Sequence, residues 1–194
     1  MTAPADPYVD RILDAAYALL TRHGLRRTTI ADVVRESGVS KATVFRRFPG
    51  RAELFDTLMS REVARFLSDL EVRLDTVEDP VDRLVETFVR FCEVAPHNVV
   101  LRRLVETDPE TVLPQLTTQA EPILAFGRAF MLGELKKLTE AGYRLTASPE
   151  VCTDLITRLS HSYILLPPTL PDFADLERIR DLFRATVVRM IVAD

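Results

Sequence analysis

The residues of this sequence whose types could do chemistry gather in a short basic stretch near the N-terminus. Lys41, Arg46 and Arg47 carry positive charges there, and Thr43 adds a hydroxyl. Arginine and lysine bind phosphate oxygens and base edges, and threonine also donates hydrogen bonds to phosphate. These residue types therefore favour recognition of a nucleic acid over covalent catalysis.

Two short helical patterns would position these side chains. Ile30, Val33 and Val34 recur at helical spacing in the first pattern, and Val44 and Phe48 do so in the second. Each set places one apolar face toward a core. The basic side chains of the second pattern then lie on its other faces.

The segment also contains signals for where each helix begins and ends. Thr29 with Asp32 resembles a capping box, which would start the first helix. Gly38 favours a left-handed corner, because a side chain there would clash. Ser40 is expected to cap the second helix by accepting from the backbone N–H near Thr43. Two helices joined by a short glycine-containing turn predict a helix-turn-helix, whose second helix fits the DNA major groove.

These residues resemble the N-terminal pattern of the tetracycline-repressor (TetR-type) transcriptional regulators. The resemblance covers roughly the first quarter to third of the chain, and its combination of spacings is specific. The matching positions are Thr29, Val33, Val34 and the runs 37–40, 45–48 and 51–54. Three positions depart from the family pattern, with Ser37 for the more common Ala, Phe45 for the usual Tyr and Arg51 for the usual Lys. Phe45 removes a phenolic contact to phosphate, whereas Arg51 keeps the charge.

The resemblance implies a homodimeric DNA-binding regulator, in most cases a repressor. Its domains would be residues 1–52 for DNA binding and 53–194 for effector binding and dimerisation. One recognition helix reads only a few base pairs, so two related by a two-fold axis suit a palindromic operator. The residues that we expect to contact or position DNA are Thr29, Ser40, Lys41, Thr43, Phe45, Arg46, Arg47 and Arg51.

Charge is distributed unevenly along the chain. Residues 1–51 hold nine Lys or Arg and five Asp or Glu, a net charge of +4. The remaining residues hold 16 basic and 24 acidic side chains, a net charge of −8. A basic head on an acidic body suits DNA bound at one end, although ordinary charge scatter would give the same numbers.

The rest of the sequence predicts an all-α protein of about nine helices. Residues 108–115 contain Pro109 and Pro114 and are expected to be irregular, and Asp172 is expected to open the last helix. By the family resemblance, residues 149–166 and 173–192 would form a four-helix dimer interface with their symmetry mates. Their apolar stripes would equally suit a monomer core.

The resemblance also implies an effector site among the helices between residues 51 and 142. An aromatic and methionine lining suits a hydrophobic or amphipathic small molecule. For any single candidate, the alternative is an ordinary core residue. The candidates are Met59, Phe88, Phe91, Cys92, Phe126, Phe130 and Met131, with Arg102 or Tyr163 as polar anchors.

Two other classes of protein compete with this interpretation. An enzyme would need a nucleophile beside a base, or several metal ligands, but three histidines and two cysteines are dispersed along the chain. Carboxylates such as Glu106 and Asp108 sit in a charge-rich pattern typical of a surface. We expect no cofactor and no metal. A constitutive DNA-binding protein without effector is the other alternative, and it predicts a well-filled body.

The sequence also bears on where the protein resides. It contains no run of about 18 apolar residues, so no transmembrane helix is expected. The N-terminal MTAPADPY lacks the pattern of a signal peptide. Cys92 and Cys152 show no CxxC spacing, which suits a reducing compartment. These features predict a cytoplasmic protein.

Overall fold

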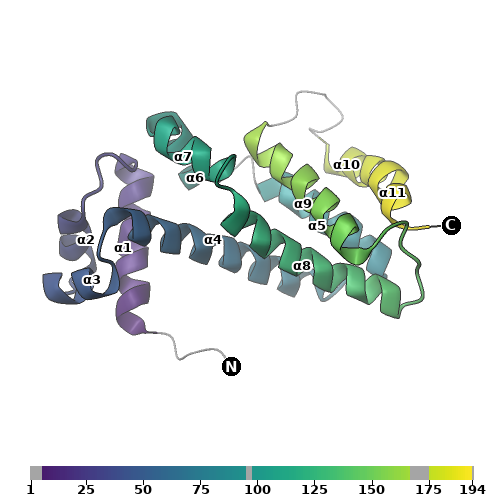
Figure 1. The fold of residues 1–194 in the computed structure, drawn as a ribbon, viewed down its shortest axis with the longest axis horizontal. Helices are drawn as coiled ribbons and strands as arrows, with labels where there is room; N and C mark the ends of the chain where they lie inside the picture. Colours follow the sequence, from purple (N-terminus) through teal and green to yellow (C-terminus); the bar gives the residue numbers. More distant parts are fainter. Residues whose placement is uncertain (1–5, 95–97, 167–174, 194) are drawn as a thin grey trace. The chain divides into compact units, whose positions relative to one another are not determined.

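The computed structural model describes residues 6–94, 98–166 and 175–193, and these are almost entirely helical (Figure 1). The helices are α1 (Pro7–His23), α2 (Ile30–Ser37), α3 (Lys41–Arg47), α4 (Arg51–Leu74), α5 (Pro80–Val94), α6 (Val99–Thr107), α7 (Pro109–Leu116), α8 (Glu121–Glu140), α9 (Pro149–Leu165), α10 (Leu176–Phe183), the π-helical segment η3 (Arg184–Val188) and α11 (Arg189–Ile191). Within these ranges the β-structure is limited to one isolated bridge between Leu145 and Val192. The predicted all-α fold with an N-terminal helix-turn-helix is confirmed.

Packing divides the chain into two compact units. Unit 1 comprises Met1–Glu62 and Asn98–Gln119, and unit 2 comprises Val63–His97 and Ala120–Asp194. Helices α6 and α7 lie beyond residue 52 in the sequence, yet they belong to unit 1, where α6 packs against α1. The functional boundary after residue 52 stays a prediction, because compactness does not show which residues bind DNA.

In unit 1, α1 supports the helix-turn-helix. Asp6 caps α1 by accepting from the backbone N–H of Tyr8, and Pro7 occupies the first helical position. Gly24 ends the helix with φ of +76°, a conformation that favours glycine. The apolar stripe of α1 is buried and includes Ile12, Leu13, Ala16, Leu19 and Leu20. Through this stripe α1 packs against α2. The apolar pattern of α1 therefore supports the first helix of the helix-turn-helix.

In unit 2, α5, α8, α9 and the last helical run share one hydrophobic core. Leu84, Val85, Leu135, Leu138 and Ile156 are fully buried within it. Helices α8 and α9 lie side by side along this core (Figure 1). Burial of apolar surface at this scale is the main stabilising term in a domain of this kind.

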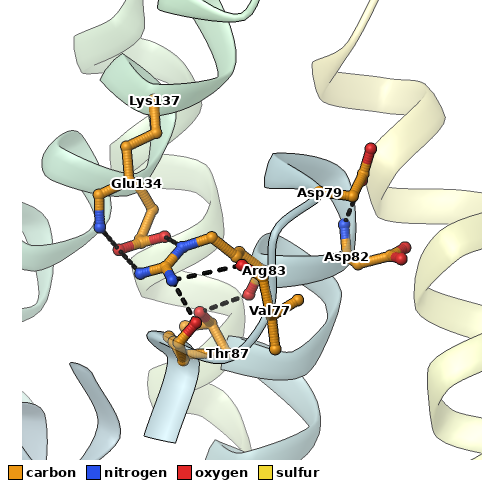
Figure 2. A network of polar contacts seen from close by, with 8 residues as sticks. Val77, Asp79, Asp82, Arg83, Thr87, Glu134 and Lys137 are labelled. Carbon is orange, nitrogen blue, oxygen red and sulfur yellow. Dashed lines mark hydrogen bonds and ion pairs between the residues drawn. The ribbon is translucent and has the colours of Figure 1, made fainter. Parts of the chain in front are cut away.

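A buried ion pair crosses the same unit. The Arg83 guanidinium on α5 donates to both carboxylate oxygens of Glu134 on α8, at 3.0 and 3.2 Å. Arg83 also donates to the backbone carbonyls of Leu74 and Val77, and Lys137 donates to Glu134 at 2.6 Å (Figure 2). The network therefore ties the last turn of α4 and the connection after it to α5 and α8.

The expectation that residues 108–115 are irregular is wrong. They fall largely within α7, with Pro109 at its first position, where a proline ring suits the helix. Pro114 lies inside the helix but only two residues before its end, so little of the hydrogen-bond ladder is lost. Val112 and Leu116 are buried, and this packing holds the short helix in place.

The C-terminal helices agree with the predicted pattern where they are described. Ser148 caps α9 through the backbone N–H of Val151, at 3.4 Å. The expected helix start at Asp172 lies outside the described residues, and α10 begins at Leu176 with Asp175 as its cap. Helix α10 continues through η3 into α11, so these three form one helical run.

Candidate nucleic-acid interface

The two helices of the candidate interface begin with the predicted caps. Thr29 accepts from the backbone N–H of Asp32 at 3.2 Å, and Asp32 accepts from the backbone N–H of Thr29 at 3.1 Å, which completes a capping box. Hydrogen bonds from Thr29 lower the pKa of Asp32, so the cap stays ionised at neutral pH. Ser40 accepts from the backbone N–H of Thr43 at 3.2 Å, which starts α3.

The turn between α2 and α3 depends on a left-handed glycine. Gly38 has φ of +64° and ψ of 16°, as the sequence predicts. Arg11 on α1 donates from Nη2 to the carbonyl of Ser37 at 2.8 Å, which satisfies a group at the end of α2. A side chain at position 38 would therefore meet both backbone strain and the Arg11 guanidinium, 3.3 Å from where its Cβ would lie.

One face of α3 is buried, and of its three basic residues only Arg46 lies on the opposite face. Val44 and Phe48 are buried, whereas Phe45 is 42% exposed. Lys41, Arg46 and Arg47 are all exposed, and Arg46 lies two residues from Val44, about 200° around the helix. Arg46 therefore points away from the core of unit 1, with Lys41 and Arg47 on the two flanks.

The candidate residues differ in the contacts that their side chains already make within the protein. Lys41 lies over the ring of Phe45, 5.8 Å from its centroid, a cation–π contact that keeps the ammonium beside the helix surface. Arg47 is paired with Asp6 at 2.5 Å. In the described part of the chain, the side chains of Arg46 and Arg51 form no ion pair. Among the charged candidates in the described residues, Arg47 alone is therefore paired with a carboxylate, whereas the charges of Lys41, Arg46 and Arg51 are not.

Asp108 was missed by the sequence interpretation, which placed it on the surface. It is fully buried, and its Oδ2 accepts from the backbone N–H groups of Leu25 and Arg26 at 2.9 and 3.2 Å. The Arg26 side chain adds an ion pair to Oδ1 at 3.2 Å. A buried carboxylate is stable when it is paired in this way. Asp108 thus fixes the connection between α1 and α2, which precedes the capping box.

The close approach of Thr107 and Asp108 to the end of α1 also explains why position 24 is a glycine. A Cβ at Gly24 would lie 2.5 Å from the Thr107 hydroxyl oxygen, so only glycine permits this approach. The Asp108-Pro109 pair is typical of a helix cap, and Asp108 does occupy that position in α7. Its side chain makes no cap hydrogen bond there, because it binds the α1–α2 connection instead.

The effector candidates do not form one cluster. Phe88, Cys92 and Met131 belong to the core of unit 2, and Tyr163 packs against that core. The Phe88 ring stacks on Phe183 at 4.1 Å and meets Tyr163 edge-on at 5.2 Å. This close packing agrees with the alternative that these candidates are ordinary core residues.

The remaining effector candidates lie elsewhere. Phe91 packs edge-on against Phe66 at 5.9 Å, and Phe126 and Phe130 on α8 are only partly covered. Met59 and Arg102 belong to unit 1. A surface hollow of about 340 Å³ in unit 2 is lined by none of the candidates, its lining residues being Asp75, Val77, Glu78, Pro80, Arg83, Lys137 and Ala141. The assignment of an effector site therefore stays a prediction.

Two features of the described residues bear on the enzyme interpretation. Burial raises the pKa of the Cys92 thiol to about 12, so it remains protonated and a poor nucleophile at neutral pH. Across the described ranges, no cluster of three or more His, Cys, Asp or Glu side chains could hold a metal ion. No helix of the described chain is both long and apolar enough to cross a bilayer.

Two comparisons with known proteins match part of the chain. The profile described as "Bacterial regulatory proteins, tetR family" matches residues 12–58, which contain α2, α3 and most of α1. The chain is 27% identical over 122 residues to the HTH-type transcriptional regulator Rv1255c of Mycobacterium tuberculosis, and it spans 60% of that protein's length.

Two further comparisons extend over most of the chain. The HTH-type transcriptional regulator AlkX of Mycobacterium tuberculosis is 27% identical over 181 residues, which cover 90% of this chain and 81% of AlkX. The crystal structure of the TetR family repressor AlkX from Dietzia sp. superposes with a TM-score of 0.70 at 20% identity. It covers 93% of this chain and 98% of that one, so the likeness in fold extends over most of the chain.

Proposed function

Because this chain belongs to the tetR family of bacterial regulatory proteins, we propose that it is a sequence-specific DNA-binding transcriptional regulator. The observation that carries the proposal is the capped α2–Gly38–α3 segment, whose second helix presents Lys41, Arg46 and Arg47 to solvent. A helix of this kind fits the major groove, where arginine distinguishes bases and lysine and arginine bind phosphates.

The geometry of α3 supports a proposal of different roles for its basic residues. Arg46 lies opposite the buried Val44 and therefore reaches deepest into a groove occupied by this helix. Lys41 and Arg47 on the flanks are placed for the phosphates that border the groove. Thr29, which caps α2, and the exposed Arg51 at the start of α4 would contact the DNA backbone on either side of α3.

We further propose that the protein acts as a homodimeric repressor on a palindromic operator. A single α3 reads too few base pairs for useful specificity, and a two-fold dimer doubles the recognised sequence. The name of the Dietzia relative calls it a repressor implicated in the biodegradation of n-alkanes. By this likeness, an apolar or amphipathic ligand would bind the dimer conformation with low affinity for DNA more tightly than the conformation that fits the operator. The operator would then be released.

A constitutive DNA-binding protein without effector is the second candidate function. The close packing of Phe88, Cys92 and Met131 in the core of unit 2 favours it. Titrating a medium-chain alkane or fatty acid into the protein–operator complex separates the two functions. Release of DNA supports the ligand-responsive repressor, and unchanged binding across such compounds supports the constitutive protein.

Replacing Arg46 by Ala tests the assigned role of α3. If Arg46 reads a base, the affinity for the operator falls about 5- to 150-fold and preference relaxes at one position. If it binds a phosphate, all sequences weaken alike and the salt slope becomes shallower by about 0.9. Binding is measured by fluorescence anisotropy at several salt concentrations.

The matched control is Arg73→Ala, which removes the same charge from an exposed position on α4 in unit 2. It should leave both the affinity and the salt slope within about twofold of the unmodified protein. Equal effects of the two substitutions, or no effect of Arg46→Ala, would remove Arg46 from the interface.

A further inference from the structure

Asp6 and Arg47 form an ion pair between the start of α1 and the end of the candidate recognition helix. The Asp6 Oδ2 atom lies 2.5 Å from Arg47 Nη2, and the two side chains are 26% and 43% exposed. The other oxygen, Oδ1, accepts from the backbone N–H of Tyr8 and caps α1. The cap anchors the carboxylate, so Asp6 faces Arg47 from a fixed position.

Arg47 occupies a different face of α3 from Arg46. One residue corresponds to about 100° of helix rotation, so the two side chains point in different directions. Arg46 points to solvent and forms no ion pair with the described residues, whereas Arg47 is directed along the surface to α1. A basic residue on the flank of a helix in the major groove approaches the phosphate backbone.

We propose that Asp6 is an affinity-setting residue of the DNA interface, because its carboxylate holds Arg47 in an ion pair that a DNA phosphate must displace. This inference rests on the proposed DNA-binding function and adds a residue outside the helix-turn-helix to it. Asp6 and the phosphate compete for one guanidinium, and DNA binding therefore breaks a contact that the unbound protein already has.

The size of the effect follows from the exposure of the pair. Ion pairs at this degree of exposure contribute little, and their loss corresponds to about a two- to fivefold change in an equilibrium constant. A new phosphate contact steepens the dependence of log affinity on log salt concentration by about 0.9, provided that the basic side chain does not give up an acidic partner within the protein to make it. Removing the Asp6 charge should therefore increase both the affinity and the salt dependence.

The experiment compares the full-length protein with Asp6→Asn, which keeps a good helix cap and removes only the charge. The DNA is a short duplex of random sequence, titrated between about 50 and 200 mM NaCl. Asp10→Asn is the matched control, because it removes the same charge from the first turn of α1 without a contact to Arg47. Arg47→Gln and the double substitution Asp6→Asn with Arg47→Gln complete a thermodynamic cycle.

We expect Asp6→Asn to bind about two- to fivefold more tightly with the steeper salt slope, and Asp10→Asn to change less. In the Arg47→Gln background the gain from Asp6→Asn should disappear, since Asp6 acts through Arg47. Unchanged or weaker binding by Asp6→Asn, or a gain that persists without Arg47, overturns the inference while leaving DNA binding intact. Failure of the unmodified protein to bind any duplex overturns the proposed function itself, and this inference with it.

Discussion

Replacing Glu134 by Ala is expected to lower the free energy of unfolding of the protein by about 3–5 kcal/mol. Glu134 accepts both donors of the Arg83 fork and a hydrogen bond from Lys137 (Figure 2). Its side chain is 4% exposed and that of Arg83 is 9% exposed. Without the carboxylate, the Arg83 charge stays buried with only backbone carbonyls as partners. Urea denaturation followed by circular dichroism measures the change.

The same helix offers a matched control. Glu140 pairs with Lys136 at 3.6 Å, but both side chains are more than half exposed. Glu140→Ala should therefore change the free energy of unfolding by less than about 0.5 kcal/mol. A double substitution of Arg83 and Glu134 by Met should cost less than Glu134→Ala alone, because no charge is left unpaired. Equal losses from Glu134→Ala and Glu140→Ala would contradict this account of the network.

The network also gives the stability a defined pH dependence. Burial raises the pKa of Glu134, but the hydrogen bonds from Arg83 and Lys137 and their charges outweigh it, so the pKa lies below its ordinary value of 4.5. A carboxyl with a lowered pKa in the folded state adds stability above its unfolded pKa, and this stability is lost as pH falls through the folded value. The difference in stability between the unmodified protein and Glu134→Gln should therefore be constant near neutral pH and shrink below about pH 4.5.

Replacing Leu155 by Glu is expected to dissociate the proposed dimer. Val151 and Leu155 lie one turn apart on α9 and are 49% and 45% exposed, and Leu182 and Met190 in the last helical run are exposed as well. Apolar side chains at this spacing suit burial against a second copy of the chain. A carboxylate placed there would lose its hydration in the interface. Sedimentation should show a monomer at micromolar concentration, and operator affinity should fall at least about 100-fold.

Because Leu155 is exposed in the single chain, the substitution should leave the fold intact, as circular dichroism would show. Val72→Glu is the control, since Val72 is 67% exposed on α4 and lies outside both helices of the proposed interface. It should remain dimeric and bind the operator normally. A dimeric Leu155→Glu protein would show that the interface lies elsewhere on the molecule.

The features predicted from sequence are those whose partners lie close along the chain. The capping box of Thr29 and Asp32, the left-handed Gly38 and the Ser40 cap are each decided within three or four residues. Local rules failed at α7, where Pro109 and Pro114 suggested an irregular segment although Val112 and Leu116 anchor a helix. Burial against the rest of unit 1 outweighed the low helix propensity of proline there.

The contacts that sequence could not predict join residues that are distant along the chain. Asp108 binds backbone N–H groups 82 and 83 residues earlier, so no local pattern distinguished it from a surface carboxylate. The pairing of Asp6 with Arg47 could not be predicted either, because the two residues lie 41 positions apart and no local pattern links them. Residue type alone also grouped Met59 and Arg102 with Phe88, although packing places them in a different unit.

Selection of bound DNA from a random pool, followed by titration of the enriched sequence at several salt concentrations, tests the central claim most directly. We predict an enriched palindrome whose half-sites lie about one helical turn apart, bound at least about 1,000-fold more tightly than random DNA. Weak binding that salt abolishes, with no enriched sequence, would contradict sequence-specific recognition by α3.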